Sequence, residues 1–194
     1  MARTYPKIWF LRHGQTEWNA QYRLQGQLDS ALTPRGISDA QDQARIMPDI
    51  LAQSPQVFAS PLGRVRQTAQ IALGGAPYIE DPRLMEIHAG AWQGMLRSDI
   101  YKQHPEFIED GASALDIYEA AEGGEGLAAL EARIVDFLSE LTVPTVIVAH
   151  GLLGQVLRGH VCNVPAPEVG QLSNEQGCVY LLENGQETVV WPSP

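Results

Sequence analysis

The chain has 194 residues, which fits one domain of ordinary size, and its 44% of hydrophobic residues can bury a full core without disulfides or metals. A formal net charge of −10 argues against a surface for nucleic acids or anionic membranes. The two cysteines show no C-x-x-C or framework spacing, so we expect both thiols to be reduced.

The N-terminal residues contain no apolar signal segment, and every apolar run is shorter than the roughly 18 residues of a membrane span. We therefore predict a cytoplasmic protein that contacts neither membranes nor nucleic acids. No repeat, low-complexity tract or linker interrupts the chain, so residues 1–194 are expected to form a single domain.

Strands and helices are expected to alternate along the chain. In order, the patterns predict a strand at 7–12, an irregular polar stretch at 14–32, a helix from Thr33-Pro34 to Pro48, a strand at 56–60, a helix from Ser60-Pro61 to Gly74-Gly75, a short strand at 78–80, a loop at 82–94, helices near 95–103 and 126–141, a strand at 145–149, a helix at 152–161, and strands at 177–183 and 187–191. This order predicts a three-layer α/β/α fold with a mostly parallel sheet and an antiparallel edge strand.

Local signals set the limits of several elements. Thr33 is a good N-cap and Pro34 suits the first helical position, whereas Pro48 should kink or end that helix. Asn184-Gly185 predicts a type I′ hairpin, and the apolar edge of that hairpin could pair with a second copy to give a homodimer. The 82–125 segment includes a stretch rich in Gly, Asp and Glu, which we interpret as a lid.

Two predicted strands end in a His-Gly pair. Arg12, His13 and Gly14 follow the first apolar run, and His150 and Gly151 follow the run at 145–149. Ligands of open α/β sheets bind in the crevice at the carboxyl ends of strands. We therefore expect both imidazoles and the Arg12 guanidinium to meet at one ligand site.

Arg64 is expected to add a second cation to this site. It falls in the first turn of the helix that begins at Ser60-Pro61, where free backbone N–H groups already attract anions. An arginine is electrostatically unfavourable for the helix at that position, which suggests that it holds an anion. Arginine also offers a bidentate fork to phosphate oxygens.

This set of residues is suited to phosphoryl transfer on histidine. Nearby arginines would lower the pKa of His13 and keep its ring neutral near pH 7, as a nucleophile requires. His150 could donate to the oxygens of the transferring group. Phosphoryl transfer depends mainly on positioning and charge stabilisation, which these side chains would supply.

Several motifs in the same order resemble the histidine phosphatase superfamily, the phosphoglycerate-mutase-like fold, in its cofactor-independent phosphatase branch. The matching segments are Leu11-Arg12-His13-Gly14-Gln15-Thr16-Glu17-Trp18-Asn19, Gln25-Gly26 with Asp29, Leu32-Thr33 and Gly36, Ser60 to Ala69, Leu84-Met85-Glu86-Ile87 with Gly90, Trp92 and Gly94, Gly124-Glu125 with Arg133, and Val148-Ala149-His150-Gly151. These motifs span most of the chain.

The resemblance implies a role for each matching residue. His13 would be the nucleophile that becomes phosphohistidine, and Glu86 would be the general acid and base. The phosphoryl oxygens would be bound by Arg12, Arg64 and His150, with help from Asn19. Residues expected on the substrate side are Gln15, Thr16, Gln25, Gly26 and Gly151.

The resemblance leaves some features open. From the residues alone, Glu80 or Asp81 could take the acid role in place of Glu86. The chain has His88 where the family commonly has a bulky apolar residue, and Gln93 where it often has Glu. These departures concern substrate specificity, because neither removes a member of the expected phosphate pocket.

Hydrolysis of a small-molecule phosphate ester, without cofactor or metal, is the function that the sequence favours. The alternatives are a mutase that moves phosphate between the hydroxyls of a glycerate and a non-catalytic module that binds a phospho-ligand. The histidines lack metal-ligand spacings such as H-x-x-x-H, which argues against a metal hydrolase. Substrates implied by the family include sugar phosphates, phosphoglycerates and a nucleoside-like phosphate from cobalamin assembly.

Overall fold

A six-stranded sheet organises the computed structural model, which describes residues 4–193 and thus all but the ends of the predicted domain. The strands are β1 (Ile8–Arg12), β2 (Gln56–Ala59), β3 (Ile79–Glu80), β4 (Thr145–Ala149), β5 (Val179–Glu183) and β6 (Gln186–Val190). Their order across the sheet is β3-β2-β4-β1-β5-β6. Neighbouring strands from β3 to β1 are parallel, while β5 is antiparallel to both β1 and β6. The predicted mostly parallel sheet is confirmed.

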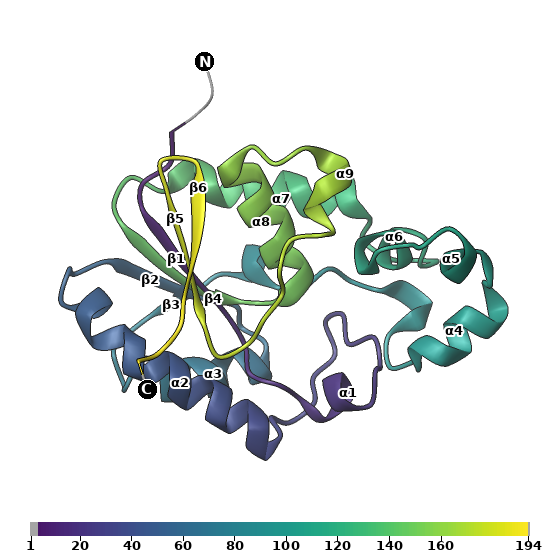
Figure 1. Cartoon of the computed structure of the whole chain (residues 1–194), viewed down its shortest axis with the longest axis horizontal. Coiled ribbons are helices and arrows are strands. Elements are labelled where there is room, and N and C mark those ends of the chain that lie inside the picture. The colour runs from purple at the N-terminus through teal and green to yellow at the C-terminus, as the bar shows by residue number, and fades with distance from the viewer. Residues whose placement is uncertain (1–3, 194) are drawn as a thin grey trace.

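Helices cover both faces of this sheet (Figure 1). They are α1 (Glu17–Ala20), α2 (Pro34–Leu51), α3 (Gly63–Ala72), α4 (Arg97–Gln103), α5 (Glu106–Glu109), α6 (Ala114–Glu119), α7 (Leu127–Glu140), α8 (Gly151–Cys162) and α9 (Ala166–Val169), with 3₁₀ turns η1 (Pro82–Leu84) and η2 (Gly90–Trp92). Figure 1 shows α2 and α3 on one side of the sheet, α7 and α8 on the other, and α4 to α6 beyond it. Within residues 4–193, no helix combines the length and apolar character needed to cross a membrane.

The apolar strands form two cores because alternate side chains face opposite layers. Ile8 and Phe10 of β1 pack in the core on the α7 and α8 side. Trp9 and Leu11 pack in the core on the α2 and α3 side. All five residues of β4 are buried, as expected for a central strand covered on both faces.

Two predicted helix limits were wrong. Pro48 lies inside α2 and does not end it, because the helix continues to Leu51 and the Pro48 carbonyl accepts from the Ala52 amide at 3.0 Å. A kink at Pro48 stays a prediction. Ser60 does not cap the next helix, which begins at Gly63 without a side-chain cap from its own N-cap residue. Asp29, from a distant loop, instead accepts hydrogen bonds from the Gly63 and Arg64 amides.

Short helices interrupt the stretches that were expected to be irregular. Four-residue α1 lies within 14–32, where Thr16 and Asn19 form a capping box. Helices α5 and α6 lie within the Gly- and acid-rich stretch. Elements of four to six residues are too short for apolar periodicity to indicate them. The hairpin turn is as predicted, with Asn184 at φ 54° and Gly185 at φ 74°.

Candidate active site

Three neighbouring strands deliver polar side chains to one edge of the sheet. His13 follows β1, His150 follows β4 and Ser60 follows β2. The strand pairing continues one step beyond each end, because the His13 amide donates to the Ala149 carbonyl and the Ser60 amide to the Val148 carbonyl, both at 3.0 Å. The rings of His13 and His150 meet edge to face, with centroids 5.3 Å apart. The two predicted strand-end histidines therefore lie together.

The His13 ring has one nitrogen tied to the backbone and one facing a cation. Nδ1 lies 2.8 Å from the Gly14 carbonyl and can only donate to it, so in the neutral ring Nε2 keeps its lone pair. Arg64 Nε donates to that Nε2 at 3.3 Å. Burial first, and then the charges of Arg64 and Arg12, hold the pKa of His13 well below its ordinary value. Nε2 is thus an unprotonated nucleophile beside a cation.

Arg64 is buried with only 2% of its surface exposed, and the loop after α1 surrounds its guanidinium. Nη2 donates to the Gly26 carbonyl at 2.8 Å, and Nη1 donates to the Leu28 carbonyl at 2.7 Å and to Asp29 at 2.9 Å. Burial lowers the pKa of Arg64, and the charges of Glu86 and Asp29 oppose that shift. The Asp29 carboxylate therefore caps the N-terminus of α3 and also orients the Arg64 side chain of that helix.

Arg12 lies on the other side of the histidine pair. Its Nη1 donates to the Asn174 carbonyl, and its Nε is buried without a hydrogen-bond partner among the described residues. A Cβ on Gly151 would come within 3.1 Å of that Nε, so glycine lets the guanidinium lie against the start of α8. Burial lowers the pKa of Arg12.

His150 is fully buried and bonded to a residue that the sequence analysis treated only as a helix cap. Its Nε2 lies 2.7 Å from Ser60 Oγ, whereas its Nδ1 has no partner within residues 4–193. Burial first, and then the charge of Arg64, hold the pKa of His150 well below its ordinary value. Both rings are therefore neutral near pH 7.

Glu86 sits on the N-terminus of α8. Its Oε2 accepts from the Leu152 amide at 3.0 Å, and its Oε1 accepts from the amides of Leu153 at 2.8 Å and Ile87 at 3.1 Å. Free amides and the helix dipole favour an anion there. Burial lowers the pKa of Arg12 and of Arg64, and the Glu86 charge opposes this shift in both, so the carboxylate lies near the two cations.

The other two candidate acids face elsewhere. Glu80 forms a bidentate pair with Arg66 at the surface, at 2.6 and 2.7 Å. Asp81 caps η1 and pairs with Arg83 at 2.7 Å. Of these three carboxylates, only Glu86 lies close enough to influence the pKa of both Arg12 and Arg64, the cations beside His13.

Backbone contacts that the sequence did not indicate hold the nucleophile's loop. A Cβ on Gly14 would overlap the Gly36 carbonyl, and a Cβ on Gly36 would overlap the Gln15 carbonyl, so the loop and α2 touch backbone to backbone. The Gly14 amide donates to Thr68 Oγ1 at 3.1 Å. Gln176 donates to the His13 carbonyl at 2.8 Å.

The residues expected on the substrate side fall into two groups. Asn19 is positioned by its capping box and lines a pocket beside Arg12. The Gln15 side chain accepts from the Thr33 hydroxyl at 2.9 Å. Gln25 donates to the buried Thr16 hydroxyl at 2.6 Å. Gln15, Thr16 and Gln25 therefore support the loop and do not line that pocket.

The pocket beside Arg12 has a volume of about 180 Å³. It is lined by Arg12, Asn19, Tyr22, Arg23, Leu24, Arg97, Ala114, Tyr118 and Leu152. Leu152 and Arg12 connect it to the histidine pair. Burial and the Glu86 charge raise the pKa of Tyr118 to about 12. Sequence reasoning missed Tyr22, Arg23, Arg97 and Tyr118.

The two residues that depart from the family pattern contact each other. Gln93 Nε2 lies 3.1 Å from His88 Nε2, and Gln93 Oε1 accepts from the Gln27 amide at 2.7 Å. His88 Nδ1 accepts from the Gly90 amide at 3.0 Å. These hydrogen bonds hold the loop after β3 in place. Neither His88 nor Gln93 lines the pocket beside Arg12.

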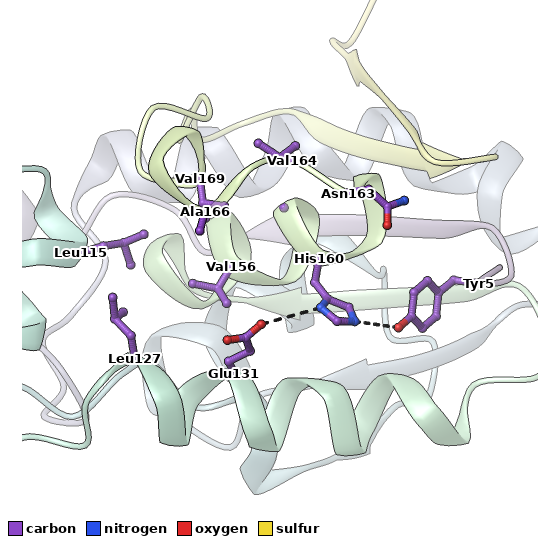
Figure 2. Close-up of a pocket in the computed structure, with 11 residues that line it drawn as sticks. Tyr5, Leu115, Leu127, Glu131, Val156, His160, Asn163, Val164, Ala166 and Val169 are labelled. Carbon is purple, nitrogen blue, oxygen red and sulfur yellow. Dashed lines mark hydrogen bonds and ion pairs between the residues drawn. The ribbon is translucent and has the colours of Figure 1, made fainter. Parts of the chain in front are cut away.

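A larger pocket of about 540 Å³ lies between α6, α7, α8 and α9 (Figure 2). Its polar end joins Tyr5 Oη to His160 Nε2 at 2.8 Å and His160 Nδ1 to Glu131 at 4.0 Å. Apolar side chains such as Val156 line the rest. None of the residues around His13 lines this pocket, so we place the candidate active site at the strand ends.

Comparison with known proteins identifies the family of this chain. Residues 8–191 match the sequence profile of the histidine phosphatase superfamily (branch 1). The chain is 34% identical over 172 residues to "Probable phosphoglycerate mutase GpmB" of Serratia proteamaculans, covering 82% of this chain and 76% of the relative. It is 34% identical over 191 residues to "Glucosyl-3-phosphoglycerate phosphatase" of Mycolicibacterium vanbaalenii, covering 87% and 80%. The solved structure of Bacillus stearothermophilus YhfR superposes with a TM-score of 0.79 at 27% identity, covering 95% of each chain.

Proposed function

Because this chain belongs to the histidine phosphatase superfamily, we infer that it hydrolyses small phosphate monoesters through a phosphohistidine formed on His13. One observation carries the assignment of His13. Its Nε2 is the unprotonated nitrogen of a buried neutral ring and faces the Arg64 guanidinium. A nucleophile held unprotonated among cations suits an electrophile with anionic oxygens.

In the first step, Nε2 attacks phosphorus on the side opposite the ester oxygen. Glu86 takes up a proton from solvent as the anionic phosphate binds beside it, because the bound anion disfavours a second negative charge there. The N–P bond then forms, the P–O ester bond breaks, and the leaving alkoxide takes that proton from Glu86. Arg64 Nε then turns its hydrogen bond from Nε2 to a phosphoryl oxygen. Arg12, Asn19 and His150 donate to the remaining oxygens, where charge develops in the transition state.

In the second step, water replaces the alcohol. Glu86, now a carboxylate, takes a proton from the attacking water, the O–P bond forms and the N–P bond to His13 breaks. The amides of Leu152 and Leu153 hold the carboxylate in place for this step. Inorganic phosphate leaves and His13 returns to its neutral form.

Other parts of the molecule support this activity. Tyr118 and Arg97 bring the 82–125 segment to the pocket, which supports its role as a lid over bound substrate.

The free Cys162 and Cys178 suit the reducing cytoplasm. Strand β6 forms one edge of the sheet, where a second copy could add to it, and the homodimer stays a prediction.

The test is phosphate release from a panel of phosphate monoesters, 3-phosphoglycerate included, in excess EDTA. We expect hydrolysis that survives EDTA, together with an acid-labile phosphoenzyme that the His13→Ala variant does not form. A relative named as a probable mutase gives the second candidate a specific basis. Isomerisation of 3-phosphoglycerate without phosphate release would establish that candidate and overturn hydrolysis.

A further inference from the structure

Arg158 of α8 is a buried arginine that the proposed chemistry does not use. Its surface is 1% exposed, and a charge is rarely buried so completely unless it is paired. Nη1 pairs with Glu187 of β6 at 2.7 Å, and the guanidinium lies 3.9 Å from the centre of the Tyr180 ring. Apolar side chains of similar volume are often as stable as a buried ion pair. Stability alone therefore does not require an arginine at this position.

Arg158 also holds the 170–178 segment, which connects α9 to β5 without a helix or strand of its own. Its Nη2 donates to the Ser173 carbonyl. One turn earlier on α8, Gln155 Nε2 donates to two more carbonyls of the segment, at 3.2 and 2.7 Å. Two side chains of one helix thus fix three carbonyls of an irregular segment.

The same segment contacts the residues at the end of β1. The Asn174 carbonyl, which directly follows the carbonyl that Arg158 holds, accepts a hydrogen bond from Arg12 Nη1. Two residues further on, Gln176 Nε2 donates to the His13 carbonyl at 2.8 Å. Because the two carbonyls belong to adjacent residues, a shift at the first displaces the second.

The Arg12 guanidinium depends on this contact for its orientation. Among residues 4–193, its only side-chain hydrogen bond is the one to the Asn174 carbonyl, and no carboxylate pairs with it. Its Nε is buried without a partner in the same part of the chain. A guanidinium that is held at one nitrogen keeps its other N–H groups for phosphoryl oxygens.

Helix α8 therefore supports the active site in two ways. Its first free amides, those of Leu152 and Leu153, hold the Glu86 carboxylate. Its side chains one and two turns later hold the 170–178 segment. One helix thus sets the position of the acid through its backbone and the position of Arg12 through its side chains.

We propose that Arg158 is a positioning residue of the active site, which acts through the 170–178 segment to hold Arg12 for the phosphoryl oxygens. Glu187 neutralises the buried charge, and the Tyr180 ring fixes the plane of the guanidinium by stacking against it. This inference rests on the proposed function, because it assigns the phosphate to Arg12 and His13.

Replacement of the whole ion pair separates positioning from stability. In Arg158→Met/Glu187→Leu, apolar side chains fill the space of the pair, a change that is often neutral or stabilising, and the bond to the Ser173 carbonyl is lost. We expect a urea midpoint close to that of the wild type. The kcat/KM for p-nitrophenyl phosphate should fall by about 10-fold to 10²-fold, because a misplacement of about 1 Å can cost that much. An unchanged kcat/KM in the folded variant would overturn the proposal.

A milder variant tests the same segment without removing a charge. Gln155→Leu deletes two hydrogen bonds to the 170–178 segment and should also lower kcat/KM, so the proposal stays testable if the double variant does not fold. Met47→Ala, in the core on the α2 side, is a destabilised control. Under conditions in which it is folded, Met47→Ala should keep the wild-type kcat/KM.

A double-mutant cycle tests the route through Arg12. In an Arg12→Ala background, Arg158→Met/Glu187→Leu should lower kcat/KM by less than about twofold, because residues that act through one another are not additive. A loss as large as in the wild-type background would show that Arg158 does not act through Arg12, and the proposal would fail.

Phosphate binding distinguishes failure of this proposal from failure of the proposed function. Calorimetric titration of His13→Ala with inorganic phosphate measures the affinity of the site without turnover. We expect Kd to rise about tenfold or more when Arg158→Met/Glu187→Leu is added, since hydrogen bonds to charged groups contribute strongly. That rise would support the positioning role even if the wild-type protein hydrolyses no ester and the proposed function fails. An unchanged Kd would overturn the positioning role and leave hydrolysis intact.

Discussion

The centre around His13 and the pocket beside it hold their charges in opposite ways. At the centre, Arg64 is enclosed by Asp29 and two carbonyls, and Glu86 is enclosed by three amides. In the outer pocket, Arg23 and Arg97 are half-buried and have no carboxylate partner within residues 4–193. The charged groups of the centre therefore already have partners that fix their positions for the chemistry, whereas the cations of the outer pocket have no carboxylate partner and remain able to bind an anion.

This difference predicts which substitutions remove catalysis and which only change selectivity. Changes at the centre should reduce the turnover of every substrate and disturb neighbouring groups. Changes in the outer pocket should act on some substrates alone. The predictions below test the centre, in order of expected effect.

His13→Ala should give the largest loss. Removing a nucleophile costs on the order of 10⁴-fold to 10⁶-fold in turnover, because the covalent intermediate can no longer form. The measurement is phosphate release together with acid-labile phosphate on the protein after a rapid quench. Near-normal turnover of the variant would place the nucleophile elsewhere. An unchanged far-UV circular dichroism spectrum would show that the variant is folded.

Glu86→Gln should slow the hydrolysis of alkyl phosphates by about 10²-fold to 10⁴-fold, the usual size of a general-acid contribution. Glutamine cannot protonate a leaving alkoxide, but p-nitrophenolate leaves with little protonation. The loss for p-nitrophenyl phosphate should therefore be clearly smaller than the loss for glycerol 3-phosphate. If both substrates lose equally, another group is the acid.

Arg64→Ala should cost roughly 10²-fold to 10³-fold in kcat, as for other fixed donors that stabilise transition-state charge. Arg66→Ala provides a matched control on the same helix, because Arg66 pairs with Glu80 at the surface. We expect Arg66→Ala to stay within about twofold of the wild-type rate. Similar losses in the two variants would mean that the helix as a whole, and not the buried guanidinium, matters.

Acid should destabilise the fold through the two buried imidazoles. The pKa values of His13 and His150 in the folded protein are held well below the ordinary 6.5. As the pH falls below 6.5, these two imidazoles therefore bind more protons in the unfolded chain than in the folded protein. The free energy of unfolding should then decrease by about 1 kcal/mol per pH unit for each ring. Urea unfolding at pH 7.5 and pH 5.5 measures this slope. His150→Asn should reduce it, and an unchanged slope in that variant would contradict the burial argument.

The sequence predicted that His13 and His150 lie together, because strand ends are easy to locate. The apolar run before His13 and the run before His150 define the two strands, and parallel neighbours must end at the same edge. Arg64 was expected from its place near the start of a helix, although that helix begins later than Ser60-Pro61 indicated. The true cap, Asp29, is more than thirty residues away in sequence and carries no local signal.

The outer pocket could not be predicted because it depends on the pairing of two loops. Nothing local distinguishes Arg23 or Arg97 from any surface arginine, and only the bridge between Arg23 and Leu96 brings them together. The short helices α5 and α6 were missed for a related reason. Their positions depend on packing against α4 and α7, and their length gives too few turns for a periodic pattern.

The backbone contact between Gly14 and Gly36 has a consequence for motion. The backbone at Gly14 and the backbone at Gly36 touch without side chains between them. The loop that carries His13 therefore cannot shift without separating the end of β1 from α2. We expect amide protons at 13–16 to exchange with deuterium only when the whole domain opens, and those at 105–125 to exchange through local opening. Substrate would then enter by movement of the segment around α5 and α6, while the position of His13 stays constant through the reaction cycle.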